Sequence, residues 1–181
     1  MKLSTKEIII CALFSAITAL LAQISIPIPF TTVPLTMQVF AVAISGVLLG
    51  AKKGFISQII YILIGSVGLP VFAQMRGGLG VVLGPTGGFI LGFPLMALVI
   101  GYFSKKYNKL IYLLIGMIIG LIIDYLLGTI LFTIVTKSTF IQGLMMCVVP
   151  FVFVDLIKIG LAAFVGVKLN KRLKIEANIL V

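Results

Sequence analysis

The sequence predicts an all-α membrane protein, a bundle of six transmembrane helices with both termini in the cytoplasm. Of its 181 residues, 61% are hydrophobic and only 10% are charged, and the mean hydropathy is +1.32. A soluble domain averages about 45–50% apolar and about 25% charged residues, so this chain belongs in a membrane. Six apolar runs approach the roughly 20 residues that a membrane helix needs. Because too little length remains for a soluble domain of about 100–150 residues, residues 1–181 are expected to form one integral membrane domain.

The predicted helices follow one another along the whole chain. They cover residues 8–26, 34–50, 55–69, 85–103, 110–135 and 140–169. Pro27 and Pro29 close the first helix, the third is short, and the last two are long enough to cross the membrane with a tilt. The first run follows two lysines but lacks a small-residue cleavage site, which indicates a retained helix rather than a signal peptide.

The charge pattern orients the predicted bundle. A net charge of +10 is compatible with nucleic acid binding, but the basic residues stand in short clusters between apolar runs, as topology signals do. Eleven of the 14 basic residues fall before the first run, between the second and third, between the fourth and fifth, or after the sixth. Arg76 and Lys137 fall on the opposite side. The positive-inside rule therefore places both termini in the cytoplasm, and we expect membrane lipid around the chain and no nucleic acid partner.

Residues 65–88, GSVGLPVFAQMRGGLGVVLGPTGG, lie on the predicted outer face and hold eight of the 19 glycines. Dense glycine lets the backbone turn sharply and approach a ligand closely. In a membrane protein, irregular backbone is tolerated where it is buried in protein or lines a cavity. Either the Gly and Pro residues mark turns, or this segment and the IPIPFTTVP loop frame a pocket that opens to the outside. The pocket is favoured because a turn needs only about two to six residues.

Asp155 and Lys158 are the strongest candidates for ligand contacts. An aspartate at the centre of a membrane helix costs about 2.5–3.5 kcal/mol, so such residues face the bundle interior and are functional candidates. Their spacing in PFVFVDLIKIG places both side chains on one helix face. They either form a private ion pair that helps the helix to insert, or they clamp a ligand. In a clamp the carboxylate accepts from N–H groups and the ammonium donates to a carbonyl or carboxylate. The clamp is slightly favoured because a buried pair is a poor source of net stability.

Asp124 and Gln38 are two further candidates. Asp124 lies in the middle of the fifth run, beside Tyr125, and either binds ligand, pairs with a lysine or arginine, or braces helices. Gln38 directly follows the TTVPLTM segment near the outer end of the second helix, and it either lines the pocket or is solvated. Gln23, near the outer end of the first helix, is open to the same two interpretations.

The outer segment supplies a third group of candidates. Arg76 either attracts an anionic group of the ligand or is a solvated loop charge. In the GPTGG turn, Pro85 suits the first position of the fourth helix, where free backbone N–H groups hold an anion or a carbonyl. The candidate contacts from this segment are Gly77, Gly78, Gly84, Pro85, Thr86 and Gly87.

The sequence argues against several other functions. It lacks the G-x-x-x-x-G-K-[ST] pattern, so the chain does not bind ATP through a P-loop. It has no histidine, and therefore neither a Ser–His pair nor an H-E-x-x-H zinc motif. Cys11 and Cys147 lie inside apolar runs, as buried free thiols do. We expect no metal or cofactor, and an enzyme would depend on intramembrane aspartates that have no supporting motif.

Residues 68–94, GLPVFAQMRGGLGVVLGPTGGFILGFP, resemble the signature of the BioY family, the biotin-specific substrate-binding (S) components of energy-coupling-factor (ECF) transporters. VPLTMQ before them and VVPFVFVDLIK after them stand at similar spacing, so the resemblance covers the second to sixth helices. It implies the S-component fold, with an outward pocket capped by the first and third loops, in a prokaryotic plasma membrane. It implies biotin as ligand, and a transmembrane (T) subunit and two cytoplasmic ATPases as partners. In that family, small residues four apart on the first helix face the membrane partner, and Ala12 and Ala16 match them.

Biotin chemistry is compatible with the candidate residues. Its ureido ring offers two N–H donors and one carbonyl, which an Asp and a Lys or Gln satisfy, and its apolar parts suit Phe, Val and Leu walls. Its carboxylate meets Lys158, Arg76 or loop amides. The sequence therefore predicts high-affinity biotin capture by a transporter subunit that is not an enzyme. Alternatives are an S component for another small vitamin, a self-sufficient channel or exporter, and, third, an intramembrane enzyme.

Overall fold

The computed structural model describes residues 4–107 and 109–179, and most of these residues are helical. The helices are α1 Thr5–Ala22, α2 Gln38–Leu49, α3 Ala51–Ser66, α4 Leu79–Val82, α5 Gly87–Lys106, α6 Leu110–Thr136, α7 Phe140–Cys147 and α8 Val152–Ile179, with a 3-10 turn at Ala73–Met75. Two short strands, β1 Ser25–Ile26 and β2 Leu35–Thr36, pair antiparallel, with Ser25 opposite Thr36 and Ile26 opposite Leu35. Residues 1–3 and 180–181, which end the predicted domain, lie outside the described residues.

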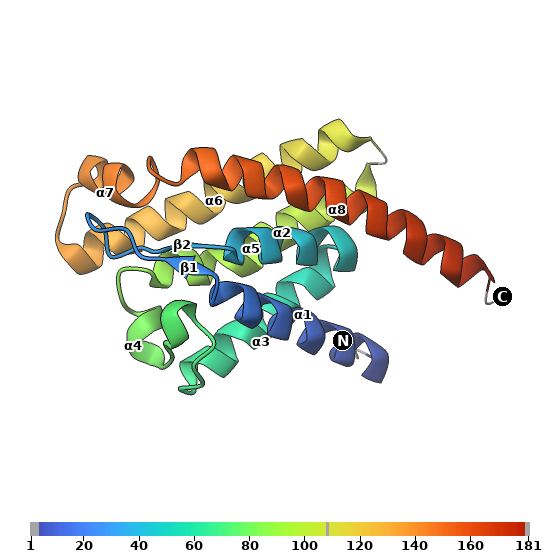
Figure 1. Ribbon diagram of the computed structural model, residues 1–181, viewed down its shortest axis with the longest axis horizontal. Coiled ribbons are helices and arrows are strands. Elements are labelled where there is room, and N and C mark those ends of the chain that lie inside the picture. Colours follow the sequence, from blue (N-terminus) through green and yellow to red (C-terminus); the bar gives the residue numbers. More distant parts are fainter. Residues whose placement is uncertain (1–3, 108, 180–181) are drawn as a thin grey trace.

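The long helices run along a common direction, and the two ends of the bundle differ (Figure 1). The start of α1 and the end of α8 lie toward one end, together with the end of α5 and the start of α6. The paired strands, α4 and α7 lie at the opposite end. This arrangement puts Arg76 and the long glycine-rich connection at the end away from the start of α1, as the charge pattern predicts.

Local sequence explains where several helices begin and end. α1 starts with a capping box, in which the Ser4 side chain accepts from the Glu7 backbone N–H and the Glu7 side chain accepts from the Ser4 N–H. α7 starts with the same device, built from Thr139 and Gln142. α6 ends at Lys137, whose backbone is left-handed with φ 55°.

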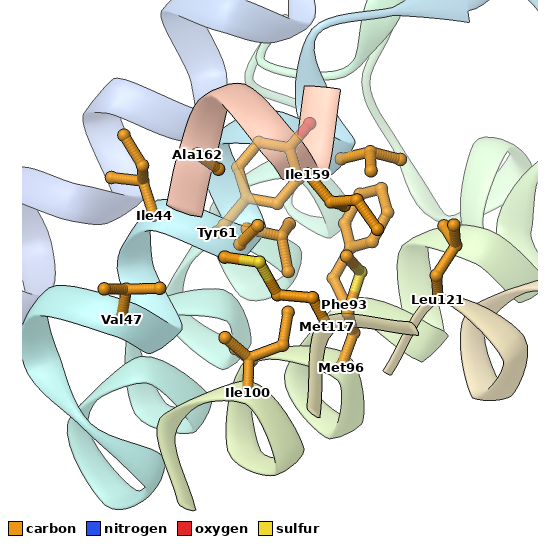
Figure 2. Close-up of a cluster of buried hydrophobic side chains, with 14 of the residues drawn as sticks. Ile44, Val47, Tyr61, Phe93, Met96, Ile100, Met117, Leu121, Ile159 and Ala162 are labelled. Atoms are coloured by element: carbon orange, nitrogen blue, oxygen red, sulfur yellow. The ribbon is translucent and has the colours of Figure 1, made fainter. Parts of the chain in front are cut away.

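An apolar core joins α2, α3, α5, α6 and α8 (Figure 2). The side chains labelled there include Met96 and Ile100 of α5 and Met117 of α6, all fully buried. Gly120 of α6 packs against this layer, because a Cβ atom there would lie 3.2 Å from both Met96 and Ile100 side-chain atoms. Helices approach closely at such small residues, which is the usual packing mode in membranes.

The predicted helix over residues 140–169 is wrong as a single element. The structure has two helices there, α7 and α8, bent by 57° across the break between them. Pro150 lies in this break. Proline lacks a backbone N–H and disfavours helical backbone at the residue before it, so an apolar run that contains it need not be one helix.

Other boundaries shift by a few residues. The predicted 34–50 helix begins only at Gln38, because Leu35 and Thr36 pair with β1 instead. The predicted 55–69 helix is α3, Ala51–Ser66, and the predicted 85–103 helix is α5, which begins at Gly87. Pro85 therefore lies in the preceding turn and not at the first helical position.

Among the described residues, α1, α5 and α6 are each long and apolar enough to cross a membrane, and the bent α7–α8 pair is a fourth span if taken as one. α2 has 12 residues and α3 has 16, so both are shorter than a full span of roughly 17–25 residues. The helical membrane class is confirmed, and the count of six crossings stays a prediction.

Candidate ligand-binding cavity

A cavity opens at the end of the bundle that carries β1, β2, α4 and α7. The space free of atoms within it and at its mouth, open solvent included, is about 710 Å³. Its walls come from residues 33–39, from residues 72–76 and 81–86 of the connection between α3 and α5, and from α5, α6, α7 and α8. We call residues 67–86, which join α3 to α5, the cap segment.

Aromatic and polar side chains share the cavity wall. The aromatic ones are Phe72, Phe89, Phe93, Tyr125 and Phe151. The charged or amide-bearing ones are Gln38, Gln74, Arg76, Asp124, Asp155 and Lys158. A mostly apolar pocket with a few convergent polar groups is the usual architecture of a small-molecule site.

Asp155 and Lys158 share one face of α8, as their spacing predicts, and they form an ion pair. The Lys158 Nζ lies 2.6 Å from Asp155 Oδ1, and each residue is 4% exposed. The hydroxyl of Tyr125 donates to the other oxygen, Asp155 Oδ2, at 2.7 Å. Both oxygens of Asp155 thus have donors, and the whole group lies against the cavity.

Asp124 is buried without any such partner. It is 1% exposed, and no donor from the described residues bonds to either of its carboxylate oxygens. Gly92 of α5 makes room for it, since a Cβ atom on Gly92 would collide with Asp124 Oδ1. A buried charge without a partner is costly, so two carboxylate oxygens without a donor among the described residues make Asp124 a candidate for ligand contact, which stays a prediction.

Gln38 belongs to a series of hydrogen bonds that extends from the cavity wall to the cap segment. Its Nε2 donates to the Tyr61 hydroxyl at 2.8 Å, and that hydroxyl donates to the Val71 carbonyl of the cap segment at 3.0 Å. Its Oε1 accepts from the Thr36 hydroxyl at 3.0 Å. At 6% exposure Gln38 is buried, so the alternative that it is solvated is wrong.

Arg76 lies at the mouth of the cavity. It is exposed, and it also lines a second, outer hollow together with Pro27, Thr31 and Gln74. Pro34, Gln74 and Arg76 line both hollows, so the two are adjacent. Arg76 is thus the cation nearest the entrance among the lining residues, whereas Lys158 lies at the buried end.

The glycines of the cap segment have a packing role in the structure. A Cβ atom on Gly77 would collide with the Leu69 carbonyl, and one on Gly84 would come within 2.8 Å of the Gly80 carbonyl. Gly78 has φ +95°, which side chains rarely adopt. Gly77, Gly78, Gly84, Pro85 and Gly87 are not among the residues that line the cavity, whereas Thr86 is.

Some backbone N–H groups in the turn before α5 donate to nearby backbone carbonyls. Gly87 N–H donates to the Gly84 carbonyl at 3.0 Å, and Gly84 N–H donates to the Val81 carbonyl at 3.2 Å. These two N–H groups are therefore occupied, whereas the sequence predicts free N–H groups in this turn. Ligand contacts by this turn stay a prediction, and Thr86 is the member best placed for one.

Several cavity residues are not predicted by the sequence patterns. Tyr125 stands out in the sequence only as the neighbour of Asp124, although its hydroxyl bonds to Asp155. Phe151 precedes Asp155 by one helical turn, so the spacing of four is a usable signal. Phe72 and Phe93 carry no comparable signal, because they lie on different segments among many other apolar residues.

The predicted partner face on α1 is exposed. Ala12 and Ala16 are both exposed, beside Ile9 and Leu13 at 62% and 56% exposure. The opposite side of the helix is buried through Cys11, Ser15, Thr18 and Ala22. The surface is therefore accessible to another membrane helix, and the partner itself stays a prediction.

Comparisons with known proteins agree with one another. The sequence model of the BioY family matches residues 1–175. A biotin transporter BioY of Thermotoga maritima is 39% identical over 171 residues, covering 94% of this chain and 99% of that protein. A probable biotin transporter BioY of Pyrococcus horikoshii is 38% identical over 168 residues, covering 93% and 98% of the two chains.

A solved structure has the same fold. The crystal structure of the S-component for biotin from an ECF-type ABC transporter superposes with a TM-score of 0.85. The two sequences are 27% identical, and the match covers 94% of this chain and 95% of the other. The S-component fold predicted from the sequence is thereby confirmed.

Proposed function

This chain belongs to the BioY family, and we propose that it captures biotin as the S component of an ECF transporter in a prokaryotic plasma membrane. One observation carries the proposal. Asp124, whose two carboxylate oxygens have no donor among the described residues, lines the same largely apolar cavity as the Asp155–Lys158 pair. Biotin presents the complementary chemistry: two N–H donors and a carbonyl on an otherwise apolar ring system.

The charges favour one orientation of biotin in the cavity. Two carboxylates and one ammonium lie at the buried end, and the exposed Arg76 lies at the mouth. We therefore place the ureido ring at the buried end, where its N–H groups donate to Asp124 and its carbonyl accepts from Lys158. The ring system packs on the aromatic wall, and the carboxylate tail points to Arg76.

Membrane topology follows from the same proposal. Residues 1–181 form one membrane domain with six crossings, in which the shorter α2 and α3 count as two. Both termini are cytoplasmic, supported by the eleven basic residues predicted on that side. The cavity then opens to the outside, as capture of an external vitamin requires.

Transport depends on other subunits in this account. Relatives of the chain are named biotin transporters, and a similar structure is a transporter S-component, so the chain is a transporter subunit rather than an enzyme. We propose that a T subunit packs on the exposed α1 face at Ala12 and Ala16 and that two ATPases hydrolyse the ATP. Small residues allow this close approach of helices.

Vitamin selectivity tests the proposal. Purified protein in detergent is titrated with biotin, thiamine and riboflavin, and free ligand is measured after rapid separation. Biotin is expected to bind far more tightly than the other two vitamins. Tighter binding of thiamine or riboflavin, or no biotin binding by protein with the helical circular dichroism of a folded bundle, would overturn the biotin assignment.

A further inference from the structure

Gln23 connects the end of α1 to the cap segment. We call residues 73–76 the tip of this segment. Its Nε2 lies 3.1 Å from the Phe72 carbonyl and 3.4 Å from the Val71 carbonyl, and it also donates to Ala19 of its own helix. Its Oε1 accepts from the Met75 backbone N–H at 2.9 Å. One side chain thus bonds to three backbone groups that are about fifty residues away in the sequence.

The backbone at this tip has an uncommon conformation. Gln74 and Met75 have φ of 61° and 56°, in the left-handed region that non-glycine residues rarely occupy. Two such residues in succession persist only when surrounding contacts hold them. The bond from Met75 N–H to Gln23 is one such contact, and the bond from Phe72 N–H to the Arg76 carbonyl at 2.9 Å is another.

The base of the cap segment, Val71 and Phe72, is also held by contacts that do not involve Gln23. The Tyr61 hydroxyl bonds to the Val71 carbonyl, and the Phe72 ring packs edge-on against Tyr61 with ring centres 5.4 Å apart. Phe72 also fills the space beside Gly65, where a Cβ atom would collide with it. Loss of Gln23 would therefore leave the base in place and weaken the hold on the tip, the part that carries Gln74 and Arg76, which would keep the bond between Phe72 and Arg76.

We propose that Gln23 is a positioning residue that holds the tip of the cap segment over the cavity and so sets the rate at which ligand leaves. Gln23 is not among the residues that line the cavity, and it acts through Ala73, Gln74 and Arg76, which are. This inference rests on the proposed function only in that the ligand occupies this cavity. The hold on the tip exists whichever ligand binds.

Gln23→Met tests the hold, because methionine keeps the length of the side chain and removes every hydrogen bond. We expect the dissociation rate of radiolabelled biotin, measured by chase with unlabelled biotin, to rise about tenfold, which corresponds to about 1.4 kcal/mol. A nitroxide on Met75→Cys, whose native side chain is 65% exposed, reports the tip directly in ligand-free protein. Its spectrum is expected to become more mobile in the Gln23→Met background.

Two comparison variants make the experiment specific. Gln142→Met removes another glutamine side chain that accepts from a backbone N–H at the same end of the bundle, that of Thr139 at 2.9 Å. It is expected to leave both the dissociation rate and the label mobility at wild-type values. Gln23→Glu keeps an oxygen for the Met75 N–H and loses the donors, and it is expected to lie between wild type and Gln23→Met in both readouts.

The outcomes separate this inference from the proposed function. Wild-type dissociation and label mobility in Gln23→Met would overturn it, and so would a mobile tip with an unchanged dissociation rate. Equal effects of Gln23→Met and Gln142→Met would also overturn it, because the effect would then be general to this end of the bundle. If wild-type protein bound no biotin, the proposed function would fail, and the label on Met75→Cys would still decide whether Gln23 holds the tip.

Discussion

At the junction of α1, α2 and α3, the buried Gln58 side chain bonds to neutral hydroxyl groups. In contrast, the buried charged groups of α6 and α8, Asp124, Asp155 and Lys158, line a cavity. Gln58 Nε2 lies 3.1–3.3 Å from the hydroxyl oxygens of Thr18, Ser45 and Ser57, and all four residues are fully buried. None of the four lines the cavity. We call them the neutral cluster, and Asp124, Tyr125, Asp155 and Lys158 the charged cluster.

The difference between the two clusters favours different roles for them. The neutral cluster packs helices together, and the charged cluster is the proposed ligand site. Hydrogen bonds between neutral side chains hold membrane helices together at about 0.6–2 kcal/mol each. Charges cost more to bury than they return, so a charged cluster with unpaired atoms is better explained by a ligand. Gln58 Oε1 also lacks a donor among the described residues, but a neutral amide oxygen is far less costly to bury than an ionised carboxylate.

The largest effect is expected from Asp155→Ala in the charged cluster. This change leaves the buried Lys158 ammonium without its ion-pair partner and the Tyr125 hydroxyl without its acceptor. Breaking a buried pair in this way costs about 3–5 kcal/mol of stability. Biotin affinity is expected to fall at least about a hundredfold, the equivalent of about 2.8 kcal/mol. Thermal unfolding in detergent and equilibrium binding measure the two losses.

The double variant Asp155→Leu with Lys158→Met is its control. Apolar residues in place of a buried ion pair are often neutral or stabilising, so the unfolding temperature is expected to recover. Biotin affinity is expected to stay low. Wild-type affinity in the double variant would show that the pair only helps α8 to insert. The proposed difference in role between the two clusters would then be contradicted.

Asp124→Leu is expected to lower affinity without lowering stability. The change removes a carboxylate that has no donor among the described residues, so the unfolding temperature is expected to hold or rise. Losing charge-assisted hydrogen bonds to the ligand, about 1.5–3 kcal/mol, lowers biotin affinity about ten- to a hundredfold. Lower stability with unchanged affinity would instead mean that Asp124 braces α6 against α5.

Gln58→Leu in the neutral cluster is expected to have the smallest effect on binding. Thr18 and Ser45 keep their bonds to the Phe14 and Val42 carbonyls, so stability is expected to fall by about 0.6–2 kcal/mol. The dissociation constant for biotin is expected to stay within about twofold of wild type, a difference of at most about 0.4 kcal/mol. A tenfold loss of affinity in a folded Gln58→Leu protein would erase the distinction between the clusters.

Sequence alone predicts the parts of the charged cluster that depend on one helix. Asp155 and Lys158 are three residues apart, so the geometry of a single helix is enough to place them together. The hydrogen bond from Tyr125 to Asp155 joins residues thirty apart in the sequence. It depends on how α6 packs on α8, which periodicity does not encode. That Asp124 is unpaired depends in the same way on the space beside Gly92 of α5.

The fold, too, is only partly predictable from the sequence. Apolar runs predict α1, α5 and α6 to within a few residues, because membrane helices are defined by length and composition. α8 ends at Ile179, ten residues beyond the predicted end at residue 169. The apolar runs miss the bend at Pro150 and the strand pairing of residues 25–36, since each depends on local backbone chemistry inside an apolar or short segment. In the cap segment, the sequence indicates unusual backbone, but it does not distinguish glycines that permit close chain packing from residues that face the cavity.

A structure of the protein with biotin bound tests the central claim most directly, because it locates the ligand relative to both clusters. The account predicts the ureido ring in the cavity, within hydrogen-bonding distance of Asp124 and the Asp155–Lys158 pair, with the carboxylate tail toward Arg76. Biotin bound away from the charged cluster, or bound while Asp124 keeps both oxygens without a donor, would contradict it.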